Sequence, residues 1–312
     1  LTADLTPNHR IIGSYFEIDE DQFGDNFGNA GLDLDYVDDV RSLPLEGLSL
    51  NYNGVITPEI AVELQYSERE FTFEGSGGND RSLTGGTWIE SINPFGRYNA
   101  PVFCGVCQDE QRDNENFLLK GSYFLSTDWG THDIVVGYDT FTDIRQSDNH
   151  QSASDFSIFN VRAIIGENDV YPEFTNGFLE TQIVHWPILG PSKGTDFTTN
   201  SMFINDRWRV NANWTFNFGL RWDENDGVDA EGKPVVDDSR LSPRFGATYD
   251  PKGDGEWLFS ASWGRYVAAI ANTVADSSSA AGTPAIIAFS YGGPGVNVGL
   301  GPNDPGLLSA ED

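Results

Sequence analysis

The sequence predicts an all-β protein, an antiparallel transmembrane β-barrel with short periplasmic turns at one rim and long extracellular loops at the other. Segments of about ten residues alternate apolar and polar side chains, as strands with one apolar and one polar face do. Very short connections between these segments alternate with long, acid-rich ones. This asymmetry between the rims is typical of outer-membrane barrels and is not a feature of sandwiches with Greek-key connections.

The first strands are the least regular. Ile11 and Ile12 are both apolar, whereas Leu48, Leu50 and Tyr52 alternate only with small polar residues. The later strands have clearer period-two patterns. Their apolar positions are Ile60, Val62, Leu64 and Tyr66; Phe117, Leu119, Tyr123 and Leu125; Ile134, Val136 and Tyr138; Met202, Ile204, Trp208 and Val210, with Asp206 interrupting the face; Trp214, Phe216, Phe218, Leu220 and Trp222; Phe245, Ala247 and Tyr249; and Trp257, Phe259, Ala261 and Trp263.

Connections of two lengths are expected between these strands. The tight turns are Pro7 to His9, Thr57 to Glu59, Asp128 to His132, Asn211 to Asn213, and Lys252 to Gly255. The long connections run over 19–43, 75–115, 146–197, 224–240 and 271–312. Within them, Phe156 to Ile165 and Phe178 to Val184 are expected to pair as a hairpin, and Ala285 to Ser290 to form one short strand. Residues 271–312, rich in Gly, Pro, Ser and Ala, are expected to form an extracellular loop.

The net charge of −30 excludes one class of partner and favours another. Acidic residues crowd the segment from Glu17 to Glu46, and such a surface repels phosphate backbones, so nucleic-acid binding is not expected. It attracts hard cations instead. Several tryptophans fall near strand ends, where aromatic side chains favour the membrane interface, although the core of a sandwich would also accommodate them.

Two cysteines lie close together in a long loop. Cys104 and Cys107 form a C-x-x-C pair, for which a structural disulfide is expected in an oxidising, cell-surface setting. A thioredoxin-type redox pair or half of a zinc site are the alternatives, and both lack their usual context: there is no βαβ pattern and no second C-x-x-C.

Calcium is a possible ligand, although no cofactor is required. Asp223, Asn225 and Asp229 place oxygen ligands at spaced positions around Gly227, as calcium loops do, although the full EF-hand spacing is absent. A second, weaker set is Asp19, Asp21 and Asp25. The alternative for both sets is a solvated acidic loop.

Enzymatic chemistry is not expected. The chain has 4 histidines, and the first two, His9 and His132, fall in predicted tight turns, where a solvated or satisfied histidine is expected. The glycines at 292, 293 and 295 lack the lysine and the following helix of a phosphate-binding loop.

Four segments carry a family resemblance. They are Phe203 to Val210, Asn217 to Asp223, Leu241 to Pro251 and Ser262 to Tyr266. Their sequences, FINDRWRV, NFGLRWD, LSPRFGATYDP and SWGRY, resemble barrel strands of TonB-dependent outer-membrane receptors. Leu5 to Arg10 and Gly130 to His132 resemble the Oar-like subgroup most.

The resemblance implies a barrel of roughly twenty-two strands that is filled by a plug. With about ten strands and no recognisable plug or TonB-binding segment, residues 1–270 are expected to be part of such a barrel. The implied function is import, in the outer membrane of a Gram-negative bacterium, of a ligand that the acidic loops capture, with energy from TonB. Arg69, Arg145, Arg207 and Arg221 are expected to face the lumen, either near the plug or as simple salt-bridge partners. The alternatives are a structural or adhesive surface barrel and a secreted calcium-binding β-sandwich.

Overall fold

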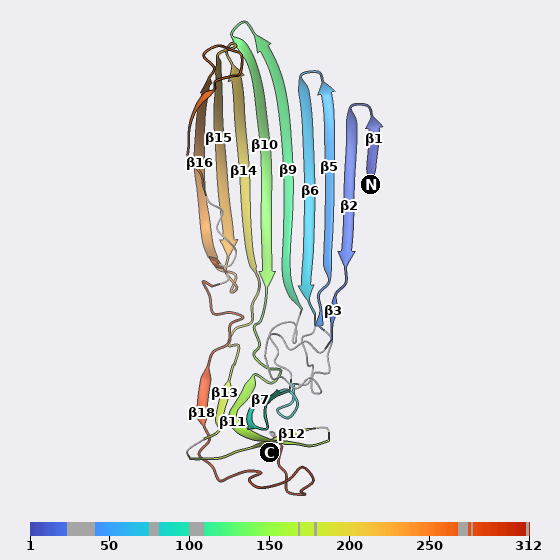
Figure 1. Ribbon diagram of the computed structural model, residues 1–312, viewed down its shortest axis with the longest axis vertical. Helices are drawn as coiled ribbons and strands as arrows, with labels where there is room; N and C mark the ends of the chain where they lie inside the picture. Colours follow the sequence, from blue (N-terminus) through green and yellow to red (C-terminus); the bar gives the residue numbers. More distant parts are fainter. Residues whose placement is uncertain are drawn as a thin grey trace.

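A computed structural model describes residues 1–23, 41–74, 81–99, 109–167, 169–177, 180–267, 274–275, 277–309 and 312. Within these residues a tall sheet stands above a small one, with the two joined by long connections (Figure 1). No helix in the described ranges is long and apolar enough to cross a membrane.

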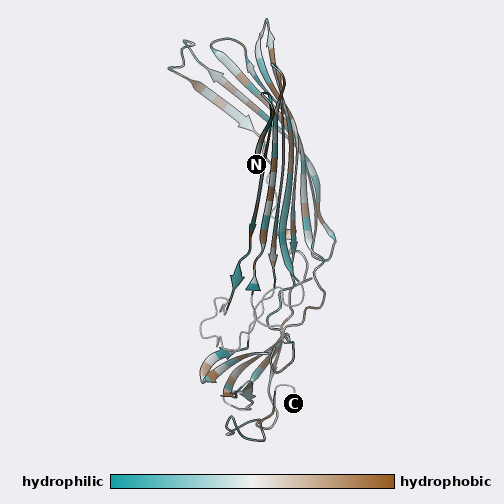
Figure 2. Ribbon diagram, turned by 90° about the vertical axis from the view of Figure 1, so that its right-hand side faces the viewer, coloured by the Kyte–Doolittle hydropathy of each residue, from teal (hydrophilic) through white to brown (hydrophobic). Residues whose placement is uncertain are grey.

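The tall sheet has ten antiparallel strands that follow one another in chain order. They are β1 (Thr2–Thr6), β2 (His9–Ile18), β5 (Leu45–Thr57), β6 (Ile60–Phe73), β9 (Glu110–Thr127), β10 (Gly130–Gln146), β14 (Thr195–Arg209), β15 (Trp214–Val228), β16 (Pro234–Tyr249) and β17 (Phe259–Gly264). Each strand pairs with the next, so the sheet is a meander, and it twists along its length (Figure 2). The predicted number of strands and their antiparallel order are confirmed.

The five predicted tight turns connect successive strands at one end of this sheet, uppermost in Figure 1. Their sequences explain why they are short. Gly130 adopts a φ of 115°, and a Cβ there would lie 2.2 Å from the carbonyl oxygen of Arg209. Asp250 accepts hydrogen bonds from the backbone N–H groups of Gly253 and Gly255 at 2.8 and 2.7 Å, which closes the last turn.

One predicted long connection is wrong. The segment 224–240 is mostly strand, because β15 continues to Val228 and β16 begins at Pro234. Here Asn225 pairs with Asp238 and Asp226 pairs with Asp237. Polar residues occupy both faces at this height, so the alternation that marks a lipid-facing strand disappears while the backbone pairing continues. Strands β9 and β14 likewise extend into the predicted loops 75–115 and 146–197.

Apolar and polar residues are interspersed along the strands of the tall sheet (Figure 2), and its two faces differ in chemistry. Directly paired residues share a face, and pairs such as Ile204 with Leu220 and Trp222 with Leu241 place the apolar set on one side. We call this the outward face and the opposite one the inward face. Outward side chains stay exposed, with Ile204 at 48% and Phe218 at 43%. A β-sandwich would bury them against a second sheet, so that alternative is wrong.

An acidic row ends the outward apolar face at the rim with the long connections. Glu68, Glu115, Asp226 and Asp237 lie on one rung of paired residues, which also includes Thr142 and Thr198. On the next rung Glu17, Glu46 and Glu70 pair in succession.

The height of the outward apolar face fits a bilayer. Trp208 near the short turns and Thr198 on the acidic rung are ten residues apart on β14. At ~3.3 Å per residue and a tilt of ~40°, ten residues rise about 25 Å, which is the height of the apolar band in outer-membrane barrels. Outward aromatic residues near the short turns, with Trp208 and Trp214 among them, form an aromatic girdle. This girdle and the acidic row therefore mark the two borders of the membrane.

The long connections form a second, six-stranded sheet. Its strands are β7 (Trp88–Asn93), β8 (Phe95–Tyr98), β11 (Phe156–Ile165), β12 (Val170–Glu173), β13 (Gln182–His185) and β18 (Ile287–Ser290); β3 (Asp21–Gln22) and β4 (Arg41–Ser42) pair separately. The expected pairing is seen, because β11 and β13 are antiparallel neighbours, but they are not a simple hairpin: β12 lies between them in sequence and also pairs with β11. The expected short strand within 271–312 is β18. The parallel pairing of β7 with β11 had no counterpart in the sequence pattern.

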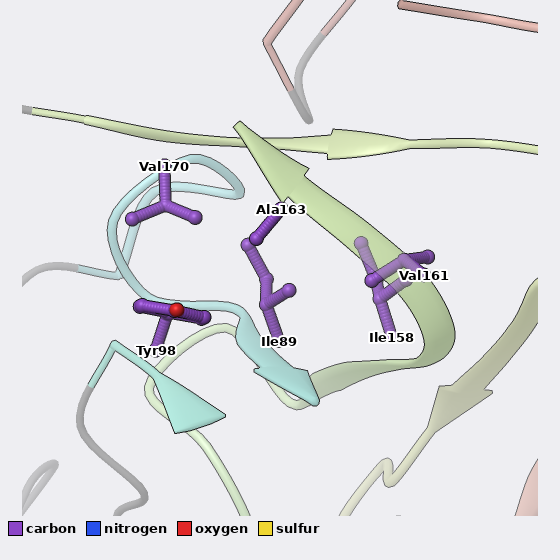
Figure 3. Close-up of a cluster of buried hydrophobic side chains, with 6 residues drawn as sticks. All are labelled: Ile89, Tyr98, Ile158, Val161, Ala163 and Val170. Atoms are coloured by element: carbon purple, nitrogen blue, oxygen red, sulfur yellow. The ribbon is translucent and has the colours of Figure 1, made fainter. Parts of the chain in front are cut away.

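This small sheet has a hydrophobic core of its own (Figure 3). Ile89 and Val161 are almost completely buried, and Ile158, Tyr98, Ala163 and Val170 complete the cluster. The core joins residues from the connections after β6 and β10, and β18 adds a strand from the segment after β17. Three segments that are distant in sequence thus fold into one unit beyond the acidic row.

Candidate functional site: the inward wall

The inward face is a polar wall whose most connected side chain is Arg221. Three polar residues pair in succession across β10, β14 and β15: Asp139, Ser201 and Asp223. Arg221 lies two residues before Asp223 on the same face of β15. The Arg221 guanidinium donates to Asp223 at 2.6 Å, to Asp139 at 3.1 Å and to the Ser201 hydroxyl at 2.7 Å. Ser201 in turn donates to Asp223 at 2.8 Å. This ion network links three strands across the middle of the wall.

A hollow of about 630 Å³ lies nearer the short turns on the same wall. Arg207 and Arg244 line it together with Asn205 and Asn217. The Arg244 guanidinium lies 4.7 Å from the centroid of the Tyr266 ring, a cation–π contact. The wall thus exposes cationic groups on a chain whose net charge is −30.

All four arginines predicted to face the lumen lie on the inward face. Arg69 pairs with Asn114, Arg145 with Thr195, Arg207 with Asn217 and Arg221 with Phe203, all in polar positions of their strands. The described strands form an open sheet, so facing a lumen stays a prediction, although each position agrees with it. Arg221 has two carboxylate partners, whereas Arg207 lines the hollow.

A buried carboxylate lies beyond the acidic row, where β9 begins. The side chain of Glu110 is 3% exposed, and its Oε2 accepts a hydrogen bond from Arg112 at 3.1 Å. Arg112 also donates to the carbonyl oxygen of Gln146, the last residue of β10, at 2.9 Å. Burial raises the pKa of Glu110 to about 7 even though Arg112 and Arg145 lower it. Glu110 therefore changes charge near neutral pH at the root of two extracellular connections.

This raised pKa predicts a local loss of stability with increasing pH. Folded Glu110 holds its proton more tightly than the unfolded chain does, so the free energy of local opening falls as pH rises from 4.5 to about 7 and is then constant. The expected fall is on the order of 3 kcal/mol. Hydrogen exchange of the backbone amides at the start of β9, corrected for intrinsic rates and followed from pH 4 to 8, measures it. Glu110→Gln flattens the profile, whereas Glu115→Gln, on the exposed outward face of the same strand, leaves it unchanged.

The predicted calcium ligands of the first set do not converge. Asp223 accepts hydrogen bonds from Arg221 and Ser201. Asn225, on the same strand as Asp223, accepts a hydrogen bond from Thr199 on β14 and donates one to Asp238 on β16. Asp229 follows the strand, and its Oδ1 accepts the backbone N–H groups of Glu231 and Lys233, both at 2.9 Å. No cluster of metal-ligating side chains occurs among the described residues.

The second calcium set lies partly within the described ranges, and both cysteines lie outside them. Asp19 and Asp21 are within them, and Asp21 accepts a hydrogen bond from Ser42 at 2.6 Å. Asp25, Cys104 and Cys107 lie outside, so the disulfide stays a prediction.

Calcium binding at the first set stays a prediction of the sequence, and the observed hydrogen bonds argue against it. We expect isothermal titration of the full-length protein with calcium, from micromolar to millimolar concentrations, to give the same heat for the wild type and for Asp229→Asn. Heat that is present in the wild type and lost in Asp229→Asn would show that this loop rearranges around the metal.

Comparisons with known proteins identify the family. The model of the TonB dependent receptor-like β-barrel matches residues 4–305. The chain therefore belongs to the TonB-dependent receptor β-barrel family. Its members are outer-membrane proteins of Gram-negative bacteria and are not enzymes, which confirms the predicted family, location and lack of enzymatic activity. The Oar-like subgroup stays a prediction.

Similar solved structures include the FrpB iron transporter of Neisseria meningitidis, at 15% identity and a TM-score of 0.46, covering 83% of this chain and 33% of that one. The ferric citrate transporter FecA gives 13% identity and a TM-score of 0.47 over 84% and 34%. The ferric-catecholate import receptor Fiu of E. coli K12 gives 12% and 0.40 over 80% and 40%. The chain thus spans about a third of the length of the first of these structures. No curated protein matches it.

Proposed function

We propose that the full protein is a TonB-dependent receptor that captures a ligand with its extracellular connections and imports it unmodified, with energy delivered by TonB. The supporting observation is the family match over nearly the whole chain, on a sheet with an exposed apolar outward face and a polar inward wall. No cofactor is proposed to be required.

The extracellular sheet is proposed as the framework for ligand capture. It packs segments from two connections around one core and adds β18 from a third, which fixes the loops that a ligand meets first. Binding residues are often found on loops that a rigid framework positions. Related solved structures are named as transporters of iron or ferric chelates. At identities of 15% and below this suggests only a first compound to test.

The test is depletion of compounds from a defined medium by cells with and without the full-length gene, each in backgrounds with and without TonB. The compounds tested include ferric chelates. We expect at least one compound to enter the cells intact only when the full-length gene and TonB are both present. Binding at the surface that needs the gene but not TonB would instead support the structural or adhesive alternative. Chemical alteration of the compound at the cell surface would contradict both proposals.

A further inference from the structure

Asp206 is the one carboxylate that interrupts the apolar part of the outward face within the described strands. Its direct neighbours are Ile134 on β10 and Phe218 on β15. Other outward carboxylates lie around the acidic row, at the far border of the membrane. Asp206 lies near the opposite border, two residues from Trp208 on β14. Because a charged group on a lipid-facing surface costs free energy, its position calls for a partner.

Among the residues that the structure describes, Asp206 has one polar side-chain partner, His132. Nδ1 of His132 lies 2.8 Å from Oδ2 of Asp206. The His132 ring stacks on Trp208 with centroids 5.4 Å apart and planes 9° apart. Trp208 is itself held in place because its indole N–H donates to the carbonyl oxygen of Trp129 at 2.9 Å. The carboxylate therefore lies beside a fixed aromatic wall.

The second oxygen of Asp206 is not satisfied by the described part of the chain. Oδ1 is covered and has no hydrogen-bond partner there. The whole side chain is 26% exposed, so a molecule on the outward face can reach the accessible part of the carboxylate but not the buried Oδ1. The nearest arginines in sequence are Arg207 and Arg209, and both lie on the inward face. The accessible part of the Asp206 carboxylate therefore has neither of these arginines beside it on the outward face.

The chemistry of the missing partner follows from these groups. An ammonium group brings positive charge and several N–H donors, and it forms strong hydrogen bonds to a carboxylate. The indole ring of Trp208 adds attraction for a cation at its face. At the height of an aromatic girdle, the groups that meet the outward face are lipid headgroups.

We propose that Asp206, with the rings of His132 and Trp208, binds the protonated primary amine of a phospholipid headgroup in the periplasmic leaflet. The site lies on the outward face and touches neither the inward wall nor the extracellular sheet. Its presence or absence is therefore independent of ligand import, and the two proposals succeed or fail separately.

Native mass spectrometry of the full-length protein tests this site. The protein is released from micelles that contain equal amounts of phosphatidylethanolamine, its N,N-dimethyl form and phosphatidylcholine with matched acyl chains. We expect occupancy to fall stepwise as N–H donors are removed, to about tenfold lower for phosphatidylcholine, as loss of a hydrogen bond to a charged group predicts. Equal retention of all three lipids overturns the proposal. This comparison uses only the wild-type protein, so its outcome does not depend on whether a variant folds.

Two variants and one competitor locate the effect. Asp206→Asn should abolish the preference for the primary amine. Asp133→Asn, an exposed carboxylate at nearly the same height on the inward face of β10, should retain it. Free phosphoethanolamine in excess should not displace the lipid, because the acyl chains hold the headgroup at this height. A preference that survives in Asp206→Asn, or displacement by the free amine, contradicts the proposal.

Discussion

Replacing Arg221 with alanine is expected to destabilise the barrel by about 3 kcal/mol, because it leaves two carboxylates without their cation. Asp223 is only 10% exposed at its side chain, so its charge is poorly solvated once Arg221 is lost. Ser201 can satisfy one oxygen and cannot neutralise the charge. The midpoint of urea unfolding of the full-length protein in lipid vesicles measures the loss.

The matched control is Arg207→Ala. Arg207 lies on the inward face of β14 and is exposed, without a carboxylate partner among the described residues. Its removal is expected to change stability by less than about 0.5 kcal/mol. Adding Asp139→Asn and Asp223→Asn to Arg221→Ala should restore much of the loss. If the two arginine variants unfold at the same midpoint, the ion network contributes nothing to stability.

Replacing Ile89 with alanine is expected to destabilise the extracellular sheet by about 3 kcal/mol while leaving the tall sheet intact. Ile89 is 0% exposed, and the cavity left by its side chain lies at the centre of the small core. Hydrogen exchange should therefore speed up in β7 and β11 and stay unchanged in β9 and β10, which share no core with them.

Ile92 on the same strand provides the control. It is 43% exposed, so Ile92→Ala removes the same atoms from a site that is half in water, and a loss below about 1 kcal/mol is expected. Equal effects of the two substitutions would mean that the small core does not hold the sheet together. Faster exchange in β9 and β10 with Ile89→Ala would mean that the two sheets unfold as one unit.

The sequence was most informative where the strands meet lipid. Between the aromatic girdle and the acidic row, hydrocarbon on one side and polar groups on the other impose a strict alternation, so Trp214 to Trp222 identified β15 and its orientation. The alternation also placed Arg221 on the inward face. The same alternation puts Asp223, two residues further on, on that face, whereas the partner Asp139 was not predictable, because it requires the register between β10, β14 and β15.

The sequence was less informative above the membrane. Residues 224 to 228 are strand, yet polar residues on both faces remove the hydrophobic signal, so they resembled a calcium loop. The extracellular sheet was also missed as a unit, because the parallel contact of β7 with β11 joins segments about 70 residues apart and no local pattern encodes it.

The assignment of the outward face to lipid is tested most directly by spin labels along β15. Single cysteines at residues 214 to 222, in full-length protein with serine at 104 and 107 and reconstituted in vesicles, report access to oxygen and to a water-soluble nickel reagent. We predict oxygen access at Trp214, Phe216, Phe218, Leu220 and Trp222 and nickel access at the residues between them. Equal nickel access at both sets, or no period of two, would contradict a membrane-spanning strand.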